Sequence, residues 1–333
     1  MTLIEQILSC RSLSIVGMAK NTGKTVCLNY LLQQLQTTGK TVAVTSIGLD
    51  GEKIDQVTQT DKPEVELSVG TYFVTSEYHY RQRQLLSEIC QLSDETTSLG
   101  RLVTAKVLGK GKVILSGPAS TKRIKSLIDR MSDYGVDLTI IDGALSRKSL
   151  ASPSVTDGLI LTTGAALSFD IPTIVRKTQF VYKLMQLSVY ETVHREKLLQ
   201  VDSGIYGIDH QTIYRLPIAS SLLFTKCKDK LFLHGNTLFI GGIVTDAMLE
   251  YLRVQPNVHT TTLVVKDFTK IFVSPFTLQS YLQKGGRLQV LLKPHLLAVC
   301  INPTSPAGYT VDSEQLRKSL AAVMQVPIYD VKS

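Results

Sequence analysis

The sequence contains no tryptophan and no apolar run as long as the roughly 18–20 residues that cross a bilayer as a helix. Residues 1–11 lack a basic start followed by a long apolar stretch, so we expect no secretory signal. No two of the five cysteines form a CxxC pair. Reduced thiols that are buried as small apolar side chains, a cytoplasmic location and no membrane association are therefore predicted.

The chain also lacks a block of basic residues, although 36 Lys and Arg against 28 Asp and Glu give a formal net charge of +8. The basic residues are scattered, and no aromatic motif of the RNA-binding type accompanies them. A solvated basic surface with a pocket for an anionic ligand is favoured over nucleic-acid binding. The six histidines show no HExxH or other ligand spacing, which argues against a histidine metal centre.

Hydrophobic residues make up 44% of the 333 residues, which is enough to form the core of one large or two ordinary domains. Strands are expected at residues 13–16, 41–45, 113–115, 138–141, 159–161, 238–240, 263–265, 271–273, 297–301 and 327–331. Helices are expected at residues 24–36, 121–131, 171–186, 246–252, 277–283 and 313–324. Continuous apolar strands that alternate with helices predict an α/β fold, with a mainly parallel sheet covered by helices on both faces.

The most specific motif is residues 17–25, GMAKNTGKT, which join a predicted strand to a predicted amphipathic helix. A glycine-containing loop that opens a helix binds phosphate through backbone N–H groups. Lys24 would reach the β- and γ-phosphates, the Thr25 hydroxyl would bind Mg²⁺, and Gly23 would allow close approach of the backbone. The motif departs from G-x-x-x-x-G-K-[ST] because five residues, rather than four, separate Gly17 from Gly23.

The loop resembles the deviant phosphate loops of the SIMIBI class of P-loop NTPases. On this basis the residues assigned to nucleotide are Gly17, Lys20, Asn21, Thr22, Gly23, Lys24 and Thr25. Dimeric ATPases of that class carry a signature lysine five residues before the loop lysine, whereas Lys20 stands four residues before Lys24. A phosphate contact by Lys20, within one chain or across a homo-oligomer, and a solvated loop charge both remain open. A second GKT, residues 39–41, leads into a strand and predicts only a turn.

Acidic and basic candidates follow other predicted strands. Asp142 ends the apolar run of residues 138–141 in the Walker B manner, and is expected to hold Mg²⁺ through water unless it merely opens a turn. Asp50, with Glu52 in reserve, follows the strand at residues 41–45, and either helps with Mg²⁺ and the attacking water or lies in a surface turn. Arg147 is the candidate for stabilising the transition state, with a solvated loop as the alternative.

Three further segments are less specific. Residues 116–120, SGPAS, either line the site or form a strand-to-helix turn. Asn302 is the candidate for reading the base, and the lack of an Asn-Lys-x-Asp motif favours ATP over GTP. The aromatic stretch around His79, residues 72–80, predicts core packing, with a lid or partner surface as the alternative.

The polar residues 194–207 predict a boundary between a P-loop NTPase domain at residues 1–195 and a C-terminal α/β domain at residues 208–333. One continuous sheet is the alternative.

Residues 17–25, 141–149, 157–166 and 301–306, with 326–330, together resemble the P-loop ATPase subunit of lysine 5,6-aminomutase reactivases. The resemblance implies a chaperone-like ATPase that uses ATP and Mg²⁺ to free an adenosylcobalamin-dependent aminomutase of damaged cobalamin. It also implies a second reactivase subunit as partner. Two other classes remain open: a small-molecule synthetase similar to dethiobiotin synthetase, and a ParA-like assembly ATPase.

Overall fold

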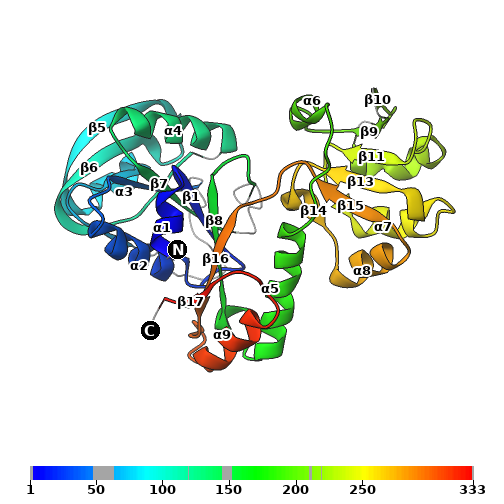
Figure 1. Ribbon diagram of the computed structural model, residues 1–333. Coiled ribbons are helices and arrows are strands. Elements are labelled where there is room, and N and C mark those ends of the chain that lie inside the picture. The colour runs from blue at the N-terminus through cyan, green and yellow to red at the C-terminus, as the bar shows by residue number, and fades with distance from the viewer. Residues whose placement is uncertain are drawn as a thin grey trace. The chain divides into compact units, whose positions relative to one another are not determined.

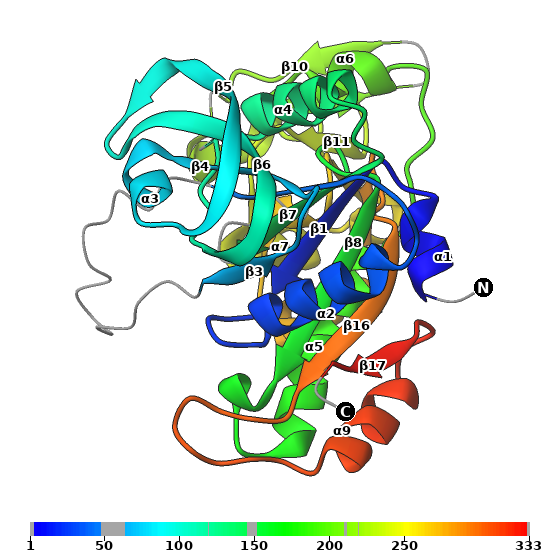
Figure 2. The same ribbon diagram turned by 90° about the vertical axis from the view of Figure 1, so that its left-hand side faces the viewer.

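The computed structural model describes residues 3–47, 64–118, 120–144, 152–209, 212–218 and 220–331 (Figures 1 and 2). The chain forms two compact units, Met1–Gln179 with His295–Ser333, and Phe180–Pro294. This division differs from the predicted domains at residues 1–195 and 208–333. The reason is strand pairing: β16 (Leu296–Asn302) lies parallel to β8 (Gly158–Gly164), so the end of the chain belongs to the first sheet. The second unit is an insertion in the first.

The first unit is built on a ten-stranded sheet with the order β17-β16-β8-β1-β7-β2-β4-β6-β3, in which β5 pairs with β6. The seven parallel strands are β17 (Ile328–Asp330), β16, β8, β1 (Ser12–Gly17), β7 (Leu138–Ala144), β2 (Val42–Ser46) and β4 (Tyr72–Ser76). The antiparallel part comprises β3 (Val65–Leu67), β5 (Gln84–Thr97) and β6 (Gly100–Val113). The predicted α/β fold with a mainly parallel sheet is confirmed.

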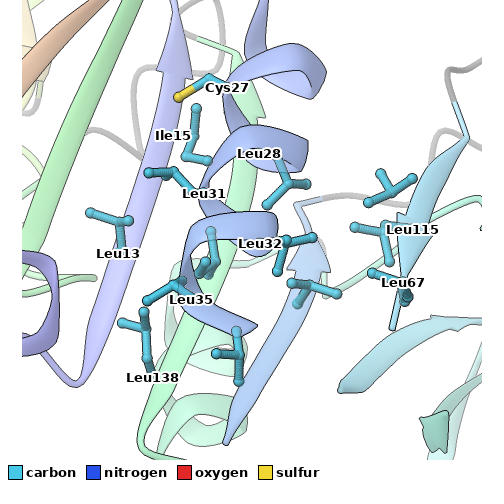
Figure 3. Packing of buried hydrophobic residues seen from close by; sticks show 14 of the residues in the cluster. Leu13, Ile15, Cys27, Leu28, Leu31, Leu32, Leu35, Leu67, Leu115 and Leu138 are labelled. Carbon is cyan, nitrogen blue, oxygen red and sulfur yellow. The ribbon is translucent and has the colours of Figure 1, made fainter. Parts of the chain in front are cut away.

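Helices cover both faces of this sheet. α2 (Lys24–Gln36) buries Leu28 and Leu31 in the same cluster as Ile140 of β7 (Figure 3). α4 (Thr121–Asp133) buries Ile128 in a cluster with Ile141. Because successive residues of a strand point to opposite faces, α2 and α4 lie on opposite sides of β7. The remaining helical elements of this unit are α1 (Leu3–Leu8), α3 (Glu77–Arg81), η2 (Ala165–Leu167) and α9 (Ser313–Ala321), and α5 (Ile171–Met185) spans the boundary between the units.

The second unit has its own sheet and core. Its five strands, in the order β10-β9-β11-β13-β15, are β10 (Ile213–Arg215), β9 (Ile205–Ile208), β11 (Thr237–Ile240), β13 (Thr262–Val265) and β15 (Arg287–Val290). Phe239, Val264 and Leu291 form its core with Leu198. The other elements are α6 (Arg195–Leu199), η3 (Ser221–Lys230), β12 (Val244–Thr245), α7 (Asp246–Arg253), η4 (Val258–Thr260), η5 (Phe268–Lys270), β14 (Ile271–Phe272) and α8 (Pro275–Gln283). Within the described ranges, no helix combines the length and apolarity that a membrane span needs.

Candidate nucleotide-binding site

The loop between β1 and α2 has the backbone geometry of an anion cradle. Asn21 (φ 63°) and Gly23 (φ 93°) are both left-handed, and they turn the chain so that α2 begins at Lys24. The first bond within the helix runs from the Cys27 N–H to the Gly23 carbonyl (2.9 Å). The N–H groups before Cys27 therefore stand at the open helix end, where they and the helix dipole favour a phosphate group.

Gly17 explains how the altered spacing is accommodated. A Cβ at this position would lie 2.6 Å from Thr22 Oγ1 and 2.9 Å from Lys24 Cγ, so no larger residue fits without displacing them. The stem of Lys24 therefore lies close against Gly17. The glycine is required for this close approach, although it is one residue further from Gly23 than the usual motif places it.

The neighbouring strand β8 contacts the loop through Thr162. The Thr22 hydroxyl donates to the Ala19 carbonyl (2.9 Å) and lies 3.1 Å from Thr162 Oγ1 of β8. Met18 N–H donates to the Thr162 carbonyl (2.9 Å). These bonds fix the loop before any ligand binds.

Asn302, at the end of β16, also contacts the loop. Its Nδ2 donates to the Asn21 carbonyl (3.4 Å) and its Oδ1 accepts from Thr304 N–H (3.2 Å). A Cβ on Gly23 would lie 2.7 Å from Asn302 Cβ, so the two residues are in tight contact. The amide therefore serves the loop backbone, and its role in reading a base stays a prediction.

Asp142 lies on β7 between β1 and β2, in register with Ile15 and Ser46. Its Oδ1 atom is buried. The Cys300 thiol, burial and the Asp142 carboxylate all raise the pKa of the Cys27 thiol, in the first turn of α2, well above its usual value. A carboxylate here and the Thr25 hydroxyl in the first turn are hard oxygen donors, the type that suits Mg²⁺ together with substrate phosphates. The residues present therefore fit a Mg²⁺–nucleotide complex.

The remaining residues and segments proposed from the sequence have the following positions. Lys20 is exposed in the loop, next to left-handed Asn21. Asp50, Glu52 and Arg147 lie outside the described residues. The second GKT is a turn, as predicted, with Gly39 at φ 69° just before β2. Of the aromatic stretch, Tyr72, Phe73 and Tyr80 are buried, which confirms core packing for these three, whereas Tyr78 is 53% exposed.

The structure adds residues at the same edge that sequence reasoning did not single out. Thr162 binds the loop directly, and a Cβ on Gly164 would lie 1.9 Å from the Asn302 carbonyl oxygen. The signal for both was the polar ending Thr-Thr-Gly of an otherwise apolar strand. From the segment at residues 116–120, which was expected either to line the site or to form a turn, Gly117 lies at the end of β2: a Cβ on it would be 1.9 Å from the Ser46 carbonyl oxygen.

Together these contacts describe a strand-loop-helix turn beside a carboxylate at the carboxyl edge of a parallel sheet. Ligands bind at this edge in open α/β sheets. No family model, curated protein or solved structure matches the chain. The functional assignment therefore depends on the geometry and on the sequence.

Proposed function

We propose that this protein binds ATP with Mg²⁺ at residues 17–25 and hydrolyses it. The observation that carries the proposal is the loop itself, where two left-handed residues open α2 while the stem of Lys24 lies close against Gly17. This arrangement provides backbone N–H groups and a mobile cation for the phosphates. The loop follows β1, and Asp142 lies on the neighbouring strand β7, near the end of that strand.

Each residue has a distinct role in this proposal. Lys24 binds the β- and γ-phosphates, and Thr25 and Asp142 hold the metal, Asp142 through water. When bound, Mg²⁺ neutralises charge on the phosphate oxygens. The hydrogen bonds of Thr22 and Asn302 fix the shape of the loop, so that little reorganisation is needed on binding.

Calorimetric titration with Mg²⁺–ATP tests the binding site. We expect Lys24→Ala to weaken the affinity at least ~100-fold, since it removes a charge-assisted contact worth about 3 kcal/mol. Lys40→Ala is the matched control, because Lys40 belongs to the second GKT and pairs with Asp137 on the surface (3.1 Å). Equal affinities in wild type and the Lys24 variant would remove the phosphate-loop assignment.

Hydrolysis is tested separately at Asp142. Asp142→Asn retains the shape of the side chain but removes the charge that organises the metal. We expect ATP still to bind and turnover to fall at least ~10-fold, which corresponds to about 1.4 kcal/mol of transition-state stabilisation. Wild-type turnover in this variant would exclude Asp142 from the metal site.

We further propose that the ATPase is a cytoplasmic, chaperone-like reactivase of a cobalamin-dependent aminomutase that acts with a second subunit. The support is the sequence resemblance of residues 141–149 and 301–306 in particular. An aminomutase inactivated with hydroxocobalamin should regain activity with this protein, its partner subunit, ATP, Mg²⁺ and fresh adenosylcobalamin, and should not regain it with the Lys24→Ala protein. ATP consumption stimulated by a small carboxylate substrate, without reactivation, would favour the synthetase class instead.

A further inference from the structure

A buried polar contact lies at the same sheet edge, two strands beyond β7. His79, in α3 after β4, has its Nδ1 2.7 Å from Ser116 Oγ and 3.1 Å from Ser76 Oγ. Ser76 and Ser116 are fully buried. Ser76 also caps α3 by accepting from the His79 N–H (3.3 Å), so backbone and ring of His79 are both fixed.

Ser116 belongs to the segment that abuts the candidate metal site. The Thr45 hydroxyl of β2 donates to the Ser116 carbonyl (3.2 Å). Gly117 lies so close to the Ser46 carbonyl oxygen that a Cβ would be 1.9 Å from it. Ser46 in turn pairs in register with Asp142, and Ile47 N–H donates to the Asp142 carbonyl (3.1 Å). A continuous set of short contacts therefore connects the imidazole with the backbone that carries Asp142.

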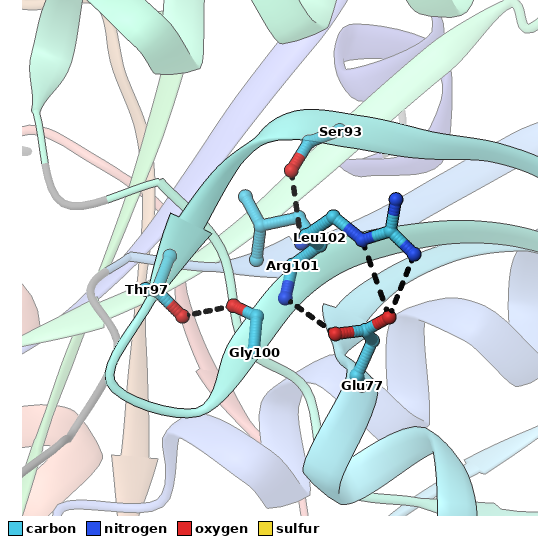
Figure 4. A network of polar contacts seen from close by, with 6 residues as sticks. All are labelled: Glu77, Ser93, Thr97, Gly100, Arg101 and Leu102. Atoms are coloured by element: carbon cyan, nitrogen blue, oxygen red, sulfur yellow. Dashed lines mark hydrogen bonds and ion pairs between the residues drawn. The ribbon is translucent and has the colours of Figure 1, made fainter.

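On its other side, α3 is held by the hairpin of β5 and β6. The Glu77 carboxylate accepts from the Arg101 backbone N–H (2.9 Å), from Arg101 Nη2 (3.1 Å) and from Nε (3.3 Å), as Figure 4 shows. These bonds to Arg101 lower the pKa of Glu77. Tyr78 N–H donates to the Leu99 carbonyl in the hairpin turn (3.2 Å). The position of His79 is thus set by residues remote from the phosphate loop.

We propose that His79 is a positioning residue for the metal side of the nucleotide site, an inference that rests on the proposed function. Its ring holds the turn at Ser116 and Gly117 against Ser46, and so fixes the ends of β2 and β7 at Asp142. Loss of the ring would leave the buried Ser116 hydroxyl without its imidazole partner, a cost that displacement of the turn would relieve. Asp142 would hold the metal through water, so a displacement of its carboxylate would weaken Mg²⁺ binding by the amount that loss of an outer-shell partner causes.

The test compares two amides at position 79. The amide of Asn occupies the place of Nδ1, whereas that of Gln extends to the place of Nε2. The readout is the gain in ATP affinity that Mg²⁺ provides, measured by calorimetry with the metal and with a chelator. We expect His79→Gln to reduce this gain about 10-fold, the size of an outer-shell effect on metal affinity, and to leave metal-free ATP affinity unchanged. His79→Asn should retain the gain to within about 3-fold, since it keeps a hydrogen-bonding atom at the right place.

His234→Gln is the matched control, because His234 is a half-buried histidine of the second unit, stacked on Tyr214 at 4.2 Å. It should leave the gain unchanged. Wild-type protein that fails to bind ATP would overturn the proposed function and this inference together. A Mg²⁺ gain in His79→Gln equal to that of wild type would overturn the inference alone, as would equal losses in the Asn and Gln variants.

Glu77→Gln keeps the imidazole and tests the same linkage from the hairpin side, and it applies whether or not the His79 variants fold. We expect a smaller loss of the Mg²⁺ gain, in the same direction, because the Gln side chain can still accept one bond from Arg101. An unchanged gain would overturn the inference, because the contacts between α3 and the hairpin would then not position His79 for the metal side of the site.

Discussion

At the scale of single residues, the loop at residues 17–25 combines a local sequence pattern with contacts from distant strands. The roles proposed for Gly23, Lys24 and Thr25 come from the local order of strand, glycine and helix, which one stretch of sequence contains. The supporting contacts of Thr162 and Asn302 come from β8 and β16, more than a hundred residues away in the chain. No local pattern specifies such a contact, because strand order is decided by packing of the whole sheet.

The pair Gly23 and Gly39 gives a prediction about close approach. Both are left-handed, but a Cβ on Gly39 meets nothing within 4 Å, whereas one on Gly23 lies 2.7 Å from Asn302 Cβ. We expect Gly39→Ala to cost only the left-handed conformation, about 1–2 kcal/mol. Gly23→Ala should cost more and should also lose ATP affinity. Chemical denaturation and calorimetry of both variants provide the measurements, and equal costs would contradict the Asn302 contact.

At the scale of elements, helix α2 was predicted correctly because its apolar residues recur at helical spacing. Apolar residues at positions 28, 31, 32 and 35 predicted the helix at residues 24–36, and α2 has these bounds with all four buried. The long strands β5 and β6 were missed. Their alternation is broken by register shifts within the pair, and β6 carries Gly109 and Gly111. Of the strand expected at residues 113–115, only Val113 belongs to a strand, as the last residue of β6.

The packing of α2 on the sheet makes a second prediction. Leu31 is fully buried in the cluster that includes Leu13 and Leu138 (Figure 3). Leu31→Ala should lower the free energy of unfolding by about 2–5 kcal/mol, because it removes apolar contacts and leaves a cavity. Gln34→Ala, at an exposed position of the same helix, should change it by less than about 0.5 kcal/mol. Comparable effects of the two substitutions in denaturant titrations would refute this packing.

At the scale of the whole molecule, the polar stretch at residues 194–207 was a poor guide to the domain boundary. It lies inside the second unit, with α6 and the start of β9, whereas the chain crosses between units at residues 179–180 and 294–295. Neither crossing has a Gly-rich or charged linker, and the first falls within α5. An insertion of this kind leaves the local apolar pattern intact, so composition alone does not reveal it.

Two compact units with separate cores predict two unfolding transitions, of which Mg²⁺–ATP stabilises one. A ligand bound only to the folded first unit should stabilise it by about 2.7 kcal/mol at a free concentration of about 100 times Kd. Leu31→Ala identifies that transition by lowering its midpoint in differential scanning calorimetry, and the ligand should raise the same one. In Lys24→Ala protein the ligand should raise neither. A site confined to the first unit does not stabilise a core that unfolds independently of it. An equal shift of both transitions would therefore contradict a nucleotide site in the first unit alone.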